Sequence, residues 1–302
     1  MYVVSVVILA YLAINNQFDV GTFSAFLLLI GKVQSPFMMI ANSYAQIQNA
    51  YGSSNRILEV INSNIIHEKP LFEISQKNIN PDSNSLLSLV NVDYYDESST
   101  FKLENIFFEL EKNEIVAIVG ESGAGKTTLM KLMMGLISPN KGIIRLNGED
   151  ITGRNEGLLS FFTYVPQESL LFEGSIEENL TLGKEKSDNE KYNALSLSNS
   201  EHLLHNFPNS LNVKLSELAK NLSGGQKSRI SLSRALLKDA SILLIDEGTA
   251  SLDKKSSNTI VRNLMEYVTF DRSIVMITHR LNEIENVDKV YEIIDGTLIR
   301  RK

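Results

Sequence analysis

The sequence predicts an α/β domain of the P-loop type, preceded by an α-helical transmembrane segment. Short apolar runs alternate with helical stretches after residue 86, as in sheets flanked by helices. One such run, Glu114–Val119, leads into G-E-S-G-A-G-K-T at Gly120–Thr127, which has the P-loop form G-x-x-x-x-G-K-[ST]. Two apolar stretches within residues 1–40 indicate the membrane segment.

Composition limits the classes of protein to which the chain can belong. Its 302 residues allow one large domain or two smaller ones, and 43% hydrophobic residues is ordinary for a globular protein. The absence of cysteine excludes disulfides and cysteine-ligated metal sites. A net charge of -7 argues against a broad surface for the phosphate backbone, so we expect no nucleic-acid partner.

The N-terminal segment, residues 1–62, is interpreted as a partial transmembrane domain of two helices in a lipid bilayer. Residues 1–14 are almost wholly apolar, although a spanning helix needs about 20 such residues. A signal peptide is the alternative, but no basic residue precedes the run and no A-x-A site follows it. Residues 15–21 form a polar turn, the expected outer loop, and residues 23–40 are apolar again.

Polar and basic residues around the second apolar stretch bear on pathway and orientation. Polar groups within a membrane usually face a cavity or a protein neighbour, so Lys32 and Gln34 are candidates to line a pathway. The alternative is that Lys32 snorkels or packs between helices. The outer loop has no basic residue, whereas Arg56 and Lys69 follow the second helix. We therefore expect a multi-pass protein of the cell membrane, with the later domain in the cytoplasm.

Residues 63–85 are predicted to be a linker, and residues 86–302 a nucleotide-binding domain. The linker region is rich in Asn, Ser and Lys and contains two prolines. Within the domain, Ser241–Ile245 and Ser273–Ile277 are short apolar runs typical of buried parallel strands.

The P-loop predicts a phosphate site for ATP or GTP. Its glycines let the backbone turn so that N–H groups point at phosphates, and the following helix adds its positive N-terminal end. Lys126 should contact the β- and γ-phosphates, and the Thr127 hydroxyl should bind Mg²⁺. The expected nucleotide-binding residues are Gly120, Glu121, Ser122, Gly123, Ala124, Gly125, Lys126, Thr127 and Thr128.

Two further motifs follow the P-loop along the chain. Ile242–Ile245 is an apolar run that ends at Asp246, where a carboxylate would hold Mg²⁺ directly or through water. Leu222–Gln226 reads L-S-G-G-Q and opens a predicted helix. A hydroxyl and backbone N–H groups at a helix start make an anion site.

With these motifs in place, the chain resembles the ATPase domain of ABC transporters. Residues 86–302 look like a nearly complete ABC ATPase domain, and residues 1–62 look like the last two membrane helices of an exporter-type half-transporter. The resemblance implies ATP as the nucleotide, a mixed sheet core with a helical subdomain, and hydrolysis coupled to transport.

The resemblance also implies roles for three residues of the nucleotide site. Glu247 matches the carboxylate that polarises the attacking water, and Gln167, in Y-V-P-Q-E, matches a glutamine that contacts Mg²⁺ and the water. His279 matches the switch histidine that contacts the γ-phosphate. These three are the expected catalytic residues, and the expected metal ligands are Thr127, Gln167 and Asp246.

A second ABC ATPase domain is the partner that the resemblance implies. In the family, the L-S-G-G-Q segment closes over ATP held by the other domain's P-loop, so Ser223, Gly224, Gly225 and Gln226 are expected to bind nucleotide there. Asp253, in A-S-L-D, matches the D-loop at the seam between the two domains. The second domain comes from an identical chain or from a homologous half-transporter.

Two segments depart from the family's pattern. An aromatic residue that stacks on adenine is usual near the strand before the P-loop, but the V-x-F-x-Y spacing puts Asp96 in its place. Tyr94 or Tyr95 is expected to substitute, and we favour Tyr95. Before L-S-G-G-Q, Lys214–Lys220 keeps only one clear match to the usual T-E-V-G-E-R-G.

Three functional hypotheses follow from these observations. In the first, the chain is the C-terminal part of an ATP-driven exporter whose unknown transported substrate is a peptide, drug or lipid. In the second, it is a truncated, membrane-tethered ATP-binding fragment or a split-transporter subunit, because two helices cannot enclose a pathway by themselves. The third, a soluble ABC ATPase, is disfavoured by the apolar run at 23–40.

Overall fold

The computed structural model divides the chain into two compact units, Met1–His67 and Glu68–Lys302. It describes residues 7–8, 10–12, 14, 19–62, 85–95, 101–154, 157–200, 203, 205, 208–238, 240–268 and 272–302. The predicted linker at 63–85 therefore lies outside the described residues except for Ser85, which begins the first strand.

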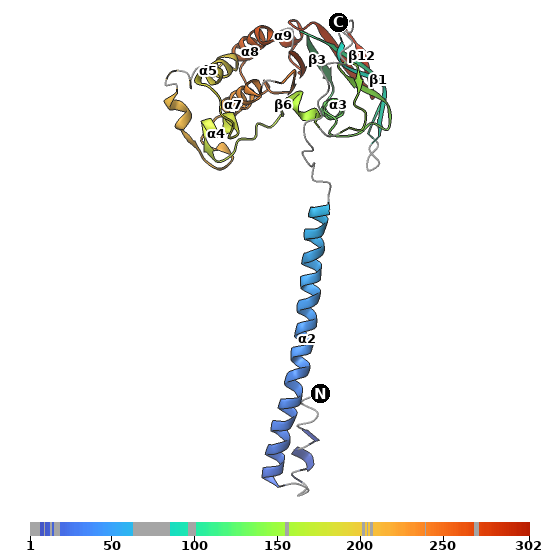
Figure 1. Cartoon of the computed structure of the whole chain (residues 1–302), viewed down its shortest axis with the longest axis vertical. Helices are drawn as coiled ribbons and strands as arrows, with labels where there is room; N and C mark the ends of the chain where they lie inside the picture. The colour runs from blue at the N-terminus through green and yellow to red at the C-terminus, as the bar shows by residue number, and fades with distance from the viewer. Residues whose placement is uncertain are drawn as a thin grey trace. The chain divides into compact units, whose positions relative to one another are not determined.

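The first unit is dominated by one long helix, α2 (Val20–Asn62), of 43 residues (Figure 1). Asp19 accepts a hydrogen bond from the backbone N of Thr22 at 3.2 Å, which satisfies a free N–H at the helix start. At about 1.5 Å per residue the helix is roughly 65 Å long, about twice the thickness of a bilayer's hydrocarbon core. Among the described residues, Ser24–Leu58 is the one span long and apolar enough to cross a membrane.

The first predicted membrane helix lies largely outside the described residues. Of residues 1–14, positions 7–8, 10–12 and 14 are helical. Most of the predicted outer loop and the side chain of Gln34 also lie outside the description, whereas Lys32 is exposed on α2.

The second unit is built on a six-stranded mixed sheet in the order β12-β11-β3-β10-β9-β6. Five of its strands run parallel, and β12 pairs antiparallel with β11. The strands are β3 (Ile115–Gly120), β6 (Phe162–Val165), β9 (Ile242–Asp246), β10 (Ser273–Ile277), β11 (Lys289–Ile294) and β12 (Thr297–Arg300).

Both faces of the mixed sheet are buried because alternate residues of each central strand enter different cores. In β9, Leu243 and Ile245 belong to one apolar cluster, and Ile242 and Leu244 belong to the other. Such strands appear in the sequence as continuous apolar runs, since neither face meets water. The α/β prediction is confirmed, with the apolar runs before Gly120 and Asp246 as central strands.

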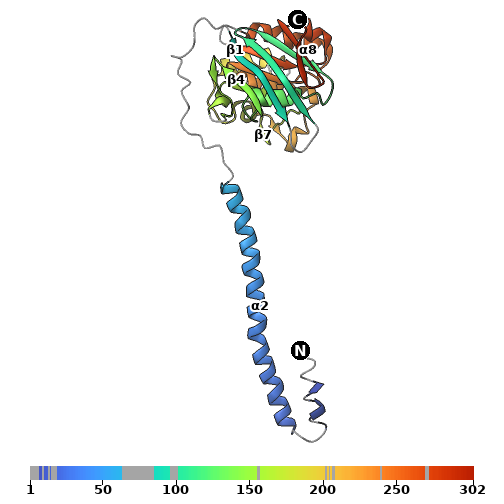
Figure 2. The same cartoon turned by 90° about the vertical axis from the view of Figure 1, so that its right-hand side faces the viewer.

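A second, antiparallel sheet in the order β2-β1-β4-β5 covers one core. Figure 2 shows β1 and β4 side by side across this part of the domain. The strands are β1 (Ser85–Tyr95), β2 (Lys102–Glu111), β4 (Lys141–Leu146) and β5 (Glu149–Asp150). Helix α3 (Lys126–Met133) contributes Leu129, Met130, Leu132 and Met133 to the same core.

A helical subdomain contains α4 (Ile176–Thr181), α5 (Asp188–Leu197) and α7 (Gly224–Leu237), which gather on the side away from β1 (Figure 1). Each helix begins with a capping box, in which an N-cap serine and a Glu or Gln three residues later satisfy each other's backbone N–H. The serines are Ser175, Ser187 and Ser223.

The remaining elements are short except for α8. Helices α8 (Lys254–Tyr267) and α9 (Leu281–Ile284) follow β9 and β10. Strands β7 (Gly174–Ser175) and β8 (Lys214–Leu215) pair with each other. Among the described residues, 3₁₀ turns span Leu158–Ser160, Asn209–Asn212 and Glu217–Ala219.

Candidate functional site

The predicted phosphate-binding and catalytic residues meet at one edge of the mixed sheet. Strands β3, β6, β9 and β10 are parallel, so their carboxyl ends lie at the same edge. The P-loop leaves β3 there, and Gln167 follows β6 by two residues. Asp246 ends β9, and His279 follows β10 by two residues. We call this set of residues the phosphate site; ligands of open α/β sheets commonly bind at such an edge.

The P-loop backbone turns sharply before α3. Gly125 precedes the helix with φ of 100°, a conformation that glycine tolerates and other residues rarely adopt. A Cβ at this position would lie 2.5 Å from Cζ of Phe101, so the Phe101 ring rests on the loop. The close contact leaves room only for glycine at position 125.

The Lys126 amine lies over the loop that precedes it. Its Nζ donates to the carbonyl oxygens of Gly120 at 2.9 Å and Glu121 at 2.7 Å. Burial lowers the pKa of Lys126, while the carboxylates of Glu247 and Asp246 oppose that change. A cation at the mouth of a loop of backbone N–H groups is suited to bind phosphate oxygens.

The Asp246 carboxylate connects the P-loop to two neighbouring strands. Its Oδ2 accepts from the Thr127 hydroxyl at 2.7 Å and from the Tyr164 phenol at 3.0 Å. Asp246 is 3% exposed, so these donors replace much of the water that would otherwise solvate the carboxylate. Burial, together with Asp246, raises the pKa of Tyr164, which keeps the phenol neutral and donating.

The sequence did not predict that Tyr164 contacts Asp246. Tyr164 lies three residues before Gln167 in a strand, and nothing in its local pattern separates it from a core residue.

The Glu247 carboxylate lies between the other two predicted catalytic side chains. Gln167 Nε2 donates to Oε2 at 2.8 Å, and His279 Nε2 lies 3.0 Å from Oε1. The Glu247 backbone has φ of 49°, in the left-handed region that costs a non-glycine residue energy. Strained residues that are held by surrounding structure concentrate at functional sites.

The oxygen donors of the phosphate site fit a hard divalent cation that is shared with phosphate. Thr127 Oγ1 and Asp246 Oδ2 are 2.7 Å apart, and both are ligand types that Mg²⁺ prefers. Among the described residues, no group of three or more His, Cys, Asp or Glu forms a metal cage. Mg²⁺ commonly binds through one or two protein oxygens together with phosphate oxygens and water, so a cage is not required.

The L-S-G-G-Q segment forms the start of α7. Ser223 caps the helix: its Oγ accepts from Gln226 N at 3.2 Å, and its own N donates to Gln226 Oε1 at 2.9 Å. A Cβ on Gly225 would lie 3.2 Å from Leu252, so this helix start packs on the 248–253 loop. Ser228 and Ser251 join the two segments through hydroxyls 2.7 Å apart.

Asp253 ends the 248–253 loop and caps α8, where its Oδ1 accepts from Ser256 N at 2.9 Å. That hydrogen bonding, through the Ser256 side chain and backbone, lowers the pKa of Asp253. Within the described residues, no hydrogen bond joins Ser223–Gln226 to the P-loop. The structure thus brings Lys126, Asp246, Glu247, Gln167 and His279 together and holds Ser223–Gln226 with Asp253 in a second group.

The predicted adenine-stacking residue, Tyr95, lies at the end of β1 and is 42% exposed. Its backbone N donates to Asn140 Oδ1 at 2.7 Å, and its phenol lies 3.4 Å from Asp93 Oδ2. Burial raises the pKa of Tyr95, and the nearby Asp93 carboxylate adds to this effect. The ring of Phe101, a residue that the sequence did not single out, lies directly against Gly125 of the P-loop.

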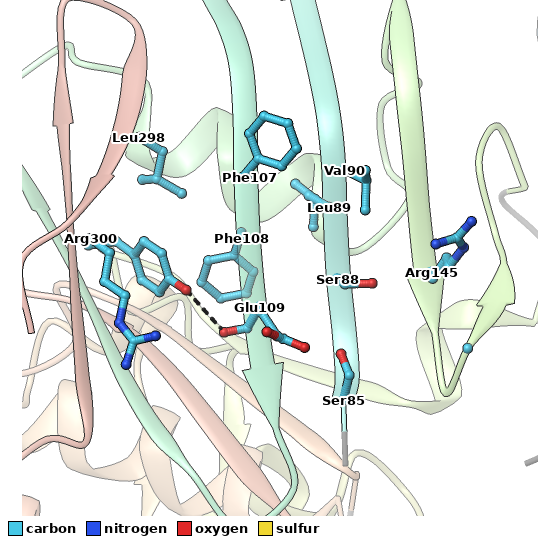
Figure 3. Close-up of a pocket in the computed structure, with 12 residues that line it drawn as sticks. Ser85, Ser88, Leu89, Val90, Phe107, Phe108, Glu109, Arg145, Leu298 and Arg300 are labelled. Atoms are coloured by element: carbon cyan, nitrogen blue, oxygen red, sulfur yellow. Dashed lines mark hydrogen bonds between the residues drawn. The ribbon is translucent and has the colours of Figure 1, made fainter. Parts of the chain in front are cut away.

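A different hollow lies along β1, β2, β4 and β12 (Figure 3). Phe107, Glu109, Arg145 and Arg300 line it, and the Tyr291 phenol donates to the Glu109 carbonyl at 3.4 Å. None of the residues of the phosphate site lines this hollow.

Comparison with known proteins gives consistent matches. Residues 103–250 match the family model described as ABC transporter. The chain is 30% identical over 293 residues to a multidrug resistance ABC transporter ATP-binding and permease protein of Lactococcus lactis, covering 95% of the chain and 48% of that protein. It is 31% identical over 298 residues to the pediocin PA-1 transport/processing ATP-binding protein of Pediococcus acidilactici, covering 96% and 40%.

A solved structure agrees with these matches. A bacterial Atm1-family ABC exporter with ATP bound superimposes with a TM-score of 0.72 at 27% identity, covering 93% of this chain and 49% of that one. The chain spans about half the length of that exporter and 40–48% of the two relatives above.

Proposed function

Because the chain carries the ATP-binding and ATPase domain of an exporter-type ABC transporter, we propose that its phosphate site binds Mg²⁺–ATP and hydrolyses it to drive export. The observation that carries the proposal is the Glu247 carboxylate, held on one oxygen by Gln167 and next to His279 on the other. That carboxylate lies one residue from Asp246, whose partner Thr127 belongs to the P-loop.

In the proposed mechanism, Lys126 and the P-loop N–H groups bind and orient the phosphates. Glu247 orients a water and accepts its proton as attack begins, since a carboxylate within hydrogen-bond reach is a suitable general base. Gln167 and His279 fix the direction of that carboxylate and line the place of the terminal phosphate. Thr127, Gln167 and Asp246 would hold Mg²⁺, which when bound neutralises charge on the phosphates.

A second ATPase domain is proposed to complete each site. ABC exporter domains typically act in pairs, and the separation of Ser223–Gln226 from this chain's own P-loop supports such pairing. The α7 N-terminus would bind the nucleotide held by the partner, with Asp253 at the seam. An identical chain and a homologous half-transporter both satisfy this arrangement.

Membrane coupling is proposed for an assembly that contains this chain. Helix α2 supplies an apolar span, and the matched relatives carry ATP-binding and permease or transport functions in their names. We propose that the chain is a multi-pass protein of the cell membrane, with its ATPase domain in the cytoplasm. The transported substrate is a peptide, drug or lipid.

Glu247→Gln in the full chain tests the hydrolytic role. The variant should bind ATP with nearly unchanged affinity and lose turnover at least about 100-fold, the size of a general-base contribution. Glu266→Gln, on the exposed side of α8, is the matched control and should hydrolyse ATP normally. Binding is measured by titration calorimetry and turnover by phosphate release; turnover retained in Glu247→Gln would contradict the assignment.

A further inference from the structure

Glu283 is a buried carboxylate that the proposed chemistry does not use. It is 0% exposed, and three hydroxyls donate to its two oxygens. Thr249 donates to Oε1 at 2.8 Å, Ser257 donates to the same oxygen, and Thr278 donates to Oε2 at 2.5 Å. We call these four residues the hydroxyl cluster.

Loss of one hydrogen bond from the hydroxyl cluster would leave a buried polar group without its partner, at a cost in folding free energy. Both Glu283 oxygens accept hydrogen bonds, and burying a polar group without partners is unfavourable. Thr249, Ser257 and Thr278 are 4%, 0% and 3% exposed, so water does not easily replace a lost donor. Each hydroxyl is therefore held in place by the carboxylate, as the carboxylate is held by the hydroxyls.

The cluster joins three segments, two of which adjoin residues of the phosphate site in the sequence. Thr249 lies in the 248–253 loop directly after Glu247, Ser257 lies on α8, and Thr278 immediately precedes His279. The loop is thus connected through Glu283 to Thr278, the residue next to His279.

Arg280 supplies a second link between the same two segments. Its Nη2 donates to the carbonyl oxygens of Ala250 at 3.0 Å and Leu252 at 2.8 Å, and its backbone N donates to Thr278 Oγ1 at 3.1 Å. The 248–253 loop is therefore bound to residues 278–283 through both side chains and backbone.

The other face of the loop touches the start of α7. Ser251 meets Ser228 through hydroxyls 2.7 Å apart, and Leu252 packs against Gly225. A continuous set of contacts therefore runs from the L-S-G-G-Q segment through the 248–253 loop and Glu283 to His279.

We propose that Glu283 is a positioning residue that couples the 248–253 loop to His279. Through it, the state of the anion site at α7 sets the position of the histidine that touches Glu247. The proposal rests on the proposed function, in which α7 binds the partner's nucleotide. It makes the two composite ATP sites depend on each other through one buried carboxylate.

Histidine NMR of the full chain in detergent tests the coupling without requiring hydrolysis. The chain has 4 histidines, and His279→Gln identifies the His279 signal in a sample with isotope-labelled histidine. Glu283→Gln, which keeps the side-chain volume, should shift that signal, as should Thr249→Val in the loop. Their double variant should shift it by less than the sum, because both remove the same connection.

Rescue separates coupling from general loss of structure. Ser257 and Glu283 touch, so Ser257→Glu combined with Glu283→Ser keeps one carboxylate and one serine hydroxyl beside Thr249 and Thr278 and should restore the His279 signal. Ser200→Ala removes a buried hydroxyl that bonds Ser198 in the helical subdomain and should leave the signal unchanged. If Glu283→Gln does not fold, Thr249→Val and the exchanged pair carry the test.

Turnover gives a second measurement. Glu283→Gln should lower kcat about tenfold and change the ATP concentration for half-saturation less than about twofold, the pattern of a lost transition-state contact. An unchanged His279 signal in both Glu283→Gln and Thr249→Val would overturn the coupling. Absence of hydrolysis in the unmodified chain would instead overturn the proposed function, and the NMR measurements would still decide the coupling.

Discussion

Tyr164 donates its phenolic hydrogen to Asp246 across the neighbouring strands β6 and β9, with 3.0 Å between the oxygens. The same carboxylate oxygen accepts from Thr127 of the P-loop. Two neutral donors on one oxygen hold the Asp246 carboxylate in a single orientation. In the proposed Mg²⁺ site, an outer donor of this kind would orient Asp246 without touching the metal.

Tyr164→Phe should therefore lower the affinity for Mg²⁺ during ATP binding. Loss of the phenol removes one of the two donors that orient the Asp246 carboxylate, and we expect the Mg²⁺ concentration for half-maximal ATP binding to rise about tenfold. Fluorescent ATP binding at varied Mg²⁺ measures this. Tyr192→Phe, at an exposed position on α5, is the matched control. Equal Mg²⁺ dependence of ATP binding in the two variants would contradict the role of Tyr164 in orienting Asp246.

The same phenol should make stability depend on alkaline pH. Its folded pKa is raised above the unfolded value of about 10, so the folded state binds more protons above that pH. The stability gained from the neutral phenol is complete below about pH 10 and is lost as pH rises further. Urea denaturation of the full chain should show a steeper alkaline decline than Tyr164→Phe does, and parallel curves would contradict this.

Measurements of ATP binding should show whether Phe101 or Tyr95 contacts the adenine. If the ring resting on Gly125 also contacts adenine, Phe101→Ala should weaken ATP binding about tenfold, while Tyr95→Ala changes it little. Tripolyphosphate, which has no base, should bind both variants equally. Weakened ATP binding in Tyr95→Ala alone would support the assignment made from the sequence.

Comparison of Ser223→Ala with Ser187→Ala should distinguish the effect of losing a helix cap from the effect of losing a contact with the partner domain. Removal of the N-cap hydroxyl of α7 should cost about 1 kcal/mol of unfolding free energy. Ser187→Ala removes the matching cap of α5 and should cost about the same. In the Glu247→Gln background, ATP should pair chains carrying Ser187→Ala but not chains carrying Ser223→Ala. Sedimentation velocity distinguishes these outcomes, and pairing by both would contradict the role of Ser223.

Local patterns in the sequence predicted the central strands and the P-loop closely. Ser273–Ile277 is both the predicted run and the whole of β10, and Glu114–Val119 differs from β3 by one residue at each end. These elements are readable because a strand buried on both faces must be apolar at every position. The capping serine of α7 is likewise a local signal.

Contacts between distant segments could not be predicted in this way. Tyr164 and Asp246 are 82 residues apart, and Glu283 meets Thr249 across 34 residues. Both contacts depend on which strands become neighbours in the sheet. The periodicity of apolar residues along the sequence does not encode that strand order. The antiparallel sheet was also missed as a unit, since irregular register interrupts the alternation along β1.

The left-handed backbone of Glu247 places folding and activity in opposition at one position. Glycine avoids the steric cost of that conformation, which is about 1–2 kcal/mol for other residues. On stability alone, mutation would thus tend to replace this glutamate. A lineage released from selection for hydrolysis is expected to lose the glutamate early, while its fold improves. Glutamate at this position is therefore expected in lineages in which ATP hydrolysis is still under selection.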